Sequence, residues 1–259
     1  MSIKSLIPAL ASIAAALTVL SACGTAPVDE NADSMAARKR AEVHLQLAVG
    51  YYSRGQFDTA QEEVRKALLI DSNNVDTYNV QGLIYMSQAQ PKLAESTFQR
   101  ALRISPDNPE VLNNYGWFMC QSGRERDALA QFSKILQNRA YPNQARVLNN
   151  AGICSLRIND LTGAEAYFTQ AFEMDPGNPA INTNLANIHY HRNQLPRAQF
   201  YINRALKAEN IAADTLWLAT RIERKLGNEA LSNGYANQLR RRHPQSPEFA
   251  SYLRGAFDE

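Results

Sequence analysis

The chain has 259 residues, of which 45% are hydrophobic and 20% are charged, and its formal net charge is +2. This composition provides enough apolar side chains for a folded core and excludes a chain that is disordered by composition. It also lacks the concentrated basic excess of a nucleic-acid-binding protein, so we expect no nucleic-acid partner.

An apolar segment at the N-terminus runs from Leu6 to Leu20, follows the single cation Lys4, and ends in Leu20-Ser21-Ala22-Cys23. At about 15 residues it is too short for an ordinary membrane-spanning helix and is typical of a signal peptide. Its ending resembles the lipobox of bacterial lipoproteins, in which the Cys is lipidated and becomes the mature N-terminus. The resemblance implies a signal peptide over residues 1–22 and a covalent lipid on Cys23.

The residue after Cys23 is Gly24 rather than Asp, which in that lipoprotein family implies sorting to the outer membrane. Several acyl chains on one Cys would form a stable anchor. We therefore expect a lipid-anchored protein on the periplasmic face of the outer membrane. Residues 23–40, which include Pro27, are interpreted as the lipidated N-terminus and a flexible tether. An uncleaved anchor or an ordinary secretory signal with an unrelated Cys is the alternative.

A repeated segment dominates the rest of the chain. Leu112-Asn113-Asn114-Tyr115-Gly116-Trp117 returns 36 residues later as Leu148-Asn149-Asn150-Ala151-Gly152-Ile153. A period of about 20–50 residues is the signature of a solenoid array. Two further series of small residues recur at similar spacing, at Ala48, Gly82, Gly116, Gly152, Ala186 and Thr220, and at Ala60, Ala94, Ala128, Ala164, Ala198 and Ser232.

Helix breakers divide this array into units. Ser105-Pro106-Asp107-Asn108-Pro109, Tyr141-Pro142 and Asp175-Pro176-Gly177-Asn178-Pro179 are turns between units, since Pro ends a helix or occupies its first turn. Glycines mark the turn inside three units, at Gly55, Gly123 and Gly227. The predicted array spans residues 41–246 and its units are 41–74, 75–108, 109–144, 145–178, 179–212 and 213–246. Residues 247–259 are predicted to form a C-terminal tail.

The small residues at fixed positions in each unit resemble the tetratricopeptide repeat family. This resemblance implies an all-α fold, a right-handed superhelical solenoid of about six repeats whose concave wall is built from the first helix of each unit. The sixth unit departs from the pattern at Thr220, Ser232 and Leu239, as a terminal unit without a neighbour is free to do.

The positions that face inward in this family carry apolar residues in the first four units and basic ones in the last. We expect a partner-binding groove lined by Val49, Tyr52, Leu83, Met86, Asn113, Trp117, Asn149, Ile153, Leu156 and Tyr190. Contiguous exposed apolar surface is typical of a docking site, and Trp117 is its best anchor. Asn113 and Asn149 are predicted to hydrogen-bond a bound backbone. Alternatively, the apolar residues pack against one another across a tightly wound superhelix, and the asparagines make local helix contacts.

Two further cysteines, Cys120 and Cys154, lie in the first helices of consecutive units. Such helices lie side by side, so we predict a disulfide between them in an oxidising periplasm. Three arginines, Arg240-Arg241-Arg242, either form a docking patch for an acidic partner or simply complement the C-terminal end of a helix.

Evidence for an enzyme is weak in this sequence. It contains no Gly-rich phosphate loop, HExxH or nucleophile elbow. His189 and His191 are two positions apart, so they point in different directions on a helix and make a poor metal pair. We expect no catalytic site, no metal, no small-molecule substrate and no cofactor other than the lipid.

A closer resemblance rests on four blocks, which are Leu112 to Cys120, Tyr141-Pro142, Gly152-Ile153-Cys154 and Ala164-Glu165-Ala166-Tyr167-Phe168. These are similar to the PilW/PilF family of type IV pilus biogenesis lipoproteins. The resemblance implies a pilotin, an outer-membrane lipoprotein that helps secretin subunits reach the outer membrane or assemble there, with secretin and other pilus assembly proteins as partners. The alternatives are a lipoprotein scaffold for cell-wall hydrolases and an enzyme with a site that no motif reveals.

Overall fold

The computed structural model describes residues 30–257 of the chain, and the predicted signal peptide and Cys23 lie outside this range. Within it the chain forms thirteen helices and no strand, which confirms the predicted all-α class. No described helix is both long and apolar enough to cross a membrane. The helices are α1 (Glu30–Ser53), α2 (Phe57–Ile70), α3 (Val75–Ser87), α4 (Pro91–Ile104), α5 (Pro109–Gln121), α6 (Glu125–Leu136), α7 (Gln144–Arg157), α8 (Leu161–Met174), α9 (Pro179–His191), α10 (Leu195–Ala205), α11 (Ala213–Lys225), α12 (Glu229–Arg242) and α13 (Pro247–Leu253).

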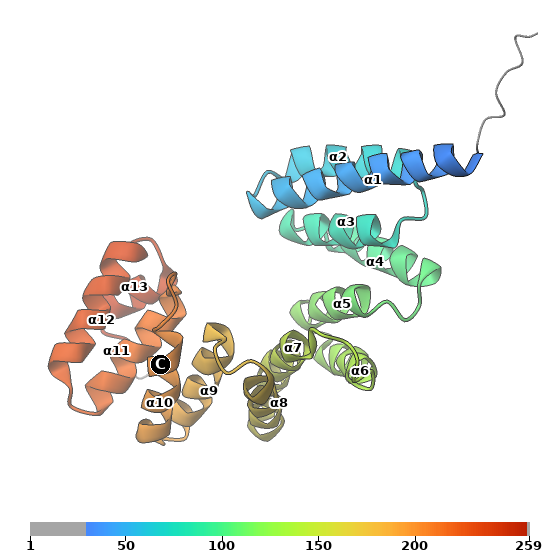
Figure 1. Ribbon diagram of the computed structural model, residues 1–259. Helices are drawn as coiled ribbons and strands as arrows, with labels where there is room; N and C mark the ends of the chain where they lie inside the picture. Colours follow the sequence, from blue (N-terminus) through green and yellow to red (C-terminus); the bar gives the residue numbers. More distant parts are fainter. Residues whose placement is uncertain (1–29, 258–259) are drawn as a thin grey trace, which may run out of the picture.

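The first twelve helices form six consecutive pairs, α1 with α2 through α11 with α12, and each pair packs on the next. Figure 1 shows the pairs following one another along a curved path. First helices of neighbouring units touch one another, as α1 does with α3, α3 with α5, α5 with α7 and α9 with α11. Among the described helices no two second helices make a comparable contact, so the first helices build the tighter, inner wall of the curve.

A glycine in the first helix and an aromatic ring in the second explain the close packing inside the central units. A Cβ added at Gly82 would lie 2.6 Å from the ring of Phe98, and one added at Gly152 would lie 2.5 Å from that of Phe168. Both rings are fully buried. The small residue at this position is therefore required by a specific ring, and the ring fills the volume that a side chain would otherwise occupy.

Each of the six turns inside a unit contains one residue with positive φ. Three of these residues are the predicted glycines, and the other three are not glycine. The six are Gly55, Ala89, Gly123, Asn159, Asn193 and Gly227. Asn adopts this left-handed conformation more readily than other non-glycine residues. The turn geometry is therefore common to all six units, although only half of them carry glycine at this position.

The turns between units are fixed by helix caps. The side chain of Asn108 accepts hydrogen bonds from the backbone N–H groups of Glu110 and Val111, at 3.0 and 3.1 Å, and Pro109 occupies the first turn of α5. Asn178 and Pro179 repeat this arrangement at the start of α9. A side-chain cap and a Pro together satisfy the free N–H groups of the first turn and set the direction of the helix.

The two ends of the described chain are more ordered than the sequence indicated. α1 begins at Glu30 rather than near residue 41, so the second part of the predicted tether is helical. This stretch contains no Gly or Pro before Gly50 and is rich in helix-forming Ala, Arg and Lys. At the other end, the predicted tail contains α13, whose first turn is capped by Ser246. α13 packs on α11 and α12 and covers the last unit (Figure 1).

Candidate functional site

The apolar stripe predicted for the inner wall lies on α1, α3, α5 and α7. Its exposure is uneven, because Val49 is 41% exposed whereas the remaining apolar members in these four helices are half-buried. Leu83, Met86 and Trp117 rest on a buried cluster that extends from unit two to unit four. The stripe therefore contributes to the core with one side of each residue and presents the other side on the inner wall.

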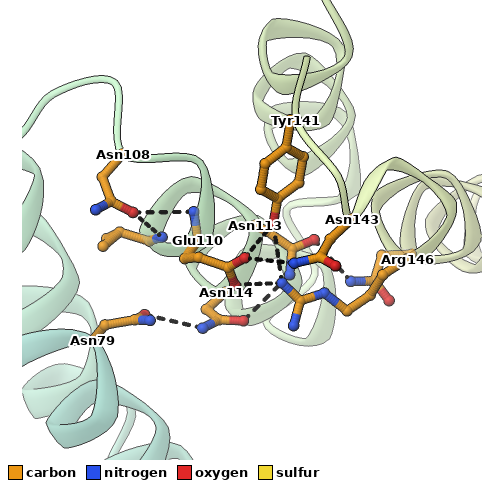
Figure 2. A network of polar contacts seen from close by, with 10 residues as sticks. Asn79, Asn108, Glu110, Asn113, Asn114, Tyr141, Asn143 and Arg146 are labelled. Atoms are coloured by element: carbon orange, nitrogen blue, oxygen red, sulfur yellow. Dashed lines mark hydrogen bonds and ion pairs between the residues drawn. The ribbon is translucent and has the colours of Figure 1, made fainter. Parts of the chain in front are cut away.

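The asparagines of the inner wall hydrogen-bond one another from unit to unit. The side-chain amide of Asn114 donates to Asn79 at 3.0 Å, that of Asn150 donates to Asn113 at 3.1 Å, and that of Asn184 donates to Asn149 at 3.0 Å. Figure 2 shows Asn79, Asn113 and Asn114 facing one another between neighbouring helices. These bonds connect α3, α5, α7 and α9 in one series, which we call the asparagine ladder.

The ladder corrects one predicted contact. Asn113 is 2% exposed, accepts from Asn150 and donates to Asn114 at 3.3 Å, so its amide is used inside the fold and cannot orient a bound backbone. Asn149 also accepts a ladder bond, although its side chain is only half-buried. The alternative interpretation of these residues as helix-to-helix contacts therefore holds at Asn113. The ladder holds neighbouring first helices in register.

A second polar network joins units three and four at the start of α5. Glu110 accepts hydrogen bonds from the Tyr141 hydroxyl at 2.6 Å and the Asn143 amide at 3.0 Å, and forms an ion pair with Arg146 (Figure 2). Burial raises the pKa of Glu110, but the hydrogen bonds from Tyr141, Arg146 and Asn143 outweigh it and hold the pKa below the ordinary value of 4.5. The carboxylate thus stays charged and joins the two units.

The two cysteines of the array are joined directly. Cys120 in α5 and Cys154 in α7 form a disulfide, with their Cα atoms 5.8 Å apart, and both are fully buried. Arg157 donates to the Cys120 carbonyl at 3.1 Å across the same pair of helices. These cysteines therefore connect units three and four and are not available as nucleophiles.

The histidines do not form a metal site in the described part of the chain, where no group of three His, Cys, Asp or Glu side chains is arranged to bind an ion. His189 is buried, lies 2.7 Å from the side-chain oxygen of Gln194 and stacks on Tyr201. His191 is exposed beyond it on the same helix. The two rings have different surroundings, as their spacing of two residues predicts.

The inner wall of the last two units is basic and is covered by the chain itself. Tyr190, a predicted groove residue, is only 3% exposed and its hydroxyl donates to the backbone carbonyl of Phe257 at 3.2 Å. Arg221 donates to the same carbonyl at 2.9 Å. Tyr190 is therefore not an open groove residue in this structure, because the returning C-terminal segment lies over it.

The three arginines at the end of α12 are exposed. Arg242 donates to the backbone carbonyl of Glu209 at 3.3 Å. Cations at this position complement the partial negative charge at the C-terminal end of the helix. This contact favours the structural interpretation of the cluster over a docking patch.

Comparison with known proteins places this geometry in a family. One model of the tetratricopeptide repeat matches residues 85–149 and 156–215, and a second such model matches residues 120–179. The type IV pilus assembly protein PilF of Pseudomonas aeruginosa is 28% identical over 211 residues, which cover 82% of this chain and 84% of PilF. A solved structure of that PilF superimposes with a TM-score of 0.73 at 27% identity, over 86% of this chain and 99% of the other.

The crystal structure of PilW, described as a widely conserved type IV pilus biogenesis factor, has a TM-score of 0.72 and is 31% identical over 82% of this chain and 98% of PilW. The chain belongs to the tetratricopeptide-repeat family of PilF and PilW. The family relation confirms the resemblance inferred from the four sequence blocks, as well as the repeat solenoid. The similarity extends over 82% of this chain, which includes helices of the array that carry the apolar stripe and the asparagine ladder.

Sequence reasoning missed two features of this PilF/PilW-family member. The Glu110 network was not predicted from the sequence. Two signals were present, since Glu110 directly follows Pro109 in the first turn of a helix and Tyr141-Pro142 lies in the turn before the next unit. The return of the C-terminal segment was also missed. The signal for it was present in Phe249, Tyr252 and Phe257, whose aromatic side chains are unusual in a segment interpreted as a tail.

Proposed function

We propose that this chain is a lipid-anchored adaptor of type IV pilus biogenesis, a pilotin that holds secretin subunits on the inner wall of its repeats at the periplasmic face of the outer membrane. The observation that supports this proposal most strongly is the kinship with PilF and PilW, both named for type IV pilus assembly or biogenesis, over more than four fifths of this chain. A repeat solenoid by itself would favour only an adaptor, because fold does not define function.

The lipid in this proposal is attached to Cys23, as the lipobox-like ending of the apolar segment implies. Only residues 24–29 separate Cys23 from the start of α1. Six residues can span at most about 20 Å. An anchored array would therefore begin close to the membrane surface, where a secretin subunit has to arrive. Replacing Cys23 by Ala should release the protein from the membrane fraction, and persistent outer-membrane fractionation of that variant would argue against the anchor.

The contact surface in this proposal is the half-buried stripe of Leu83, Met86, Trp117, Ile153 and Leu156. The asparagine ladder and the disulfide hold the helices that carry it, so little conformational freedom is lost when a partner binds. A secretin subunit exposes unpaired strand edges before it assembles, and such edges aggregate unless they are covered. A rigid apolar wall suits the task of holding such a subunit, and no catalysis or cofactor is needed for it.

The experiment that tests the proposal measures secretin multimers on a denaturing gel in cells that carry Trp117→Ala together with Leu83→Asp. We expect multimer abundance to fall toward that of a deletion strain, because the central anchor is lost and a charge enters the stripe. Leu69→Asp is the matched control, since Leu69 is 81% exposed on α2 and outside the stripe. Thermal melting of each purified variant shows whether the fold is intact, and Trp117→Ala alone serves as the milder variant.

Undiminished secretin multimers in the folded double variant would remove the inner wall from the mechanism. A pull-down from solubilised envelope distinguishes the proposed cargo from the alternative one. Recovery of secretin supports the pilotin, whereas recovery of cell-wall amidases without secretin would favour a scaffold for hydrolases.

A further inference from the structure

The C-terminal segment crosses the inner wall of the last two units in the manner of a bound peptide. After α13 ends at Leu253, the chain turns at Gly255, which has a φ of +70°. The carbonyl of Phe257 then accepts hydrogen bonds from the Arg221 guanidinium at 2.9 Å and the Tyr190 hydroxyl at 3.2 Å. Recognition of a backbone carbonyl by side chains does not depend on the sequence of the segment that supplies the carbonyl.

The side chain of Phe257 occupies an aromatic and cationic cradle. Its ring centroid lies 5.2 Å from that of Trp217 and 6.0 Å from that of Tyr252, which meets it edge-on. The guanidinium carbon of Arg224 lies 4.0 Å from the Phe257 centroid. An aromatic ring held between an aromatic wall and a cation gains both dispersion and cation–π energy. The cradle therefore selects an aromatic side chain.

The surface around the cradle is positive. The guanidinium of Arg221 lies 4.7 Å and the ammonium of Lys225 lies 4.4 Å from the Tyr190 ring centroid. Partial desolvation, together with the charges of Arg221 and Lys225, lowers the pKa of the neighbouring His191, whose side chain is otherwise exposed. Glu223, the acidic residue of α11 closest in sequence to these cations, accepts hydrogen bonds from the side chains of Gln199 and Asn228, at 3.0 and 2.7 Å. Carboxylates next to a bound aromatic residue would thus be favoured.

The chain's own sequence meets both requirements, because the aromatic Phe257 is followed by the acidic residues Asp258 and Glu259. Residues 255–257 follow α13 and turn back on it, since the backbone N–H groups of Gly255 and Ala256 donate to the carbonyls of Tyr252 and Ser251, both at 3.0 Å. α13 itself packs on α11 and α12. The last unit therefore keeps the cover of α13 when Phe257 leaves its cradle.

We propose that the inner wall of units five and six is a second peptide-binding site, which takes a segment with an aromatic residue followed by carboxylates, and that residues 255–257 occupy it as an internal competitor. A partner segment of that chemistry binds by displacing Phe257. The site is distinct from the apolar stripe of units one to four, and the inference does not rest on the pilus assignment.

The test uses fluorescence anisotropy with a labelled synthetic peptide of the sequence of residues 251–259, added to the full chain and to its Phe257→Ala variant. An internal competitor that fills the site for about 90–99% of the time weakens apparent binding about 10- to 100-fold. The Phe257→Ala chain should therefore bind the peptide at least about tenfold more tightly than the unmodified chain. A peptide with Ala in place of its own Phe should bind neither chain.

Two further variants complete the design. Added to Phe257→Ala, Arg224→Ala should weaken peptide binding about fivefold through loss of the cation–π contact, whereas Arg241→Ala, the same change at an exposed position on α12, should not. Gly255→Ala strains the turn that returns the segment and leaves the cradle intact, so it should also raise peptide affinity. Equal binding to the unmodified and Phe257→Ala chains, or no binding to either, would overturn the proposal, as would a loss of the folded state in Phe257→Ala.

Discussion

The packing of one glycine against one ring gives the most direct structural prediction. A Cβ added at Gly116 in α5 would lie 2.7 Å from Cε1 of Phe132, with two more ring atoms at 3.1 and 3.2 Å. Phe132 is fully buried, so its ring cannot swing into solvent to make room. Gly116→Ala therefore forces the first and second helices of unit three apart.

The expected cost combines two opposing effects. Overpacking of a well-filled core costs about 1–3 kcal/mol, whereas replacing Gly by Ala inside a helix stabilises by about 1 kcal/mol. We expect Gly116→Ala to lower the free energy of unfolding by about 1 kcal/mol, within a range of about 0–2. Urea denaturation followed by circular dichroism measures this difference.

A matched control separates packing from helix propensity. Gly234 lies inside α12 with no atom within 4 Å of an added Cβ, so Gly234→Ala should stabilise by about 0.5–1 kcal/mol. Combining Gly116→Ala with Phe132→Leu should cost less than the sum of the two single changes, because the smaller side chain leaves room for the methyl group. If Gly116→Ala stabilised as much as Gly234→Ala, the ring-against-glycine explanation of the repeat would be refuted.

The remaining predictions concern the links between units and the basic end of the wall. Cys120→Ala opens a bridge with a sequence separation of 34 to Cys154. It should lower the free energy of unfolding of the oxidised protein by about 3–4 kcal/mol, and should cost much less under reducing conditions, where the bridge is already open. The pKa of Glu110 is lower in the folded chain than in the unfolded chain, so its contribution to the free energy of unfolding is full above about pH 4.5 and is lost as the pH falls. Glu110→Gln should therefore reduce the loss of stability at acid pH, measured by urea titrations at several pH values. An unchanged pH dependence would contradict the network. Partial desolvation and the cations Arg221 and Lys225 of α11 lower the pKa of His191. Lys225→Gln should therefore raise this pKa in an NMR titration, and a fall would contradict the positive field.

Much of the fold is readable from the sequence because each unit is local. Small residues recur at fixed spacing and Pro-containing turns interrupt them, so the helix pairs follow from period and breakers. The turn inside each unit is less visible, since Ala89 adopts the same left-handed conformation as Gly123 without any signal in its residue type. The helical extension of α1 is consistent with its helix-forming residues, although they do not mark where the helix begins. The packing of α13 depends on contacts with α11 and α12, which residue patterns do not encode directly.

The sequence predicts where the side chains of the candidate site lie, but not how far each of them is exposed. Helix period places Leu83 and Trp117 on the inner wall, and they are there, half-buried. How much of each side chain a partner can reach depends on how tightly the units wind, which is a property of the whole array. Asn113 and Tyr190 show the consequence, because a neighbouring unit covers one and the C-terminal segment covers the other.

The central proposal is that the inner wall of this repeat array holds secretin. Site-specific photocrosslinking in living cells tests it most directly, with a benzoylphenylalanine introduced at position 117 on the inner wall or at position 69 on the exposed face of α2. The account predicts a crosslinked product that contains secretin from position 117 and none from position 69. Secretin crosslinked from position 69 alone, or from neither position while pilus assembly proceeds normally, would contradict it.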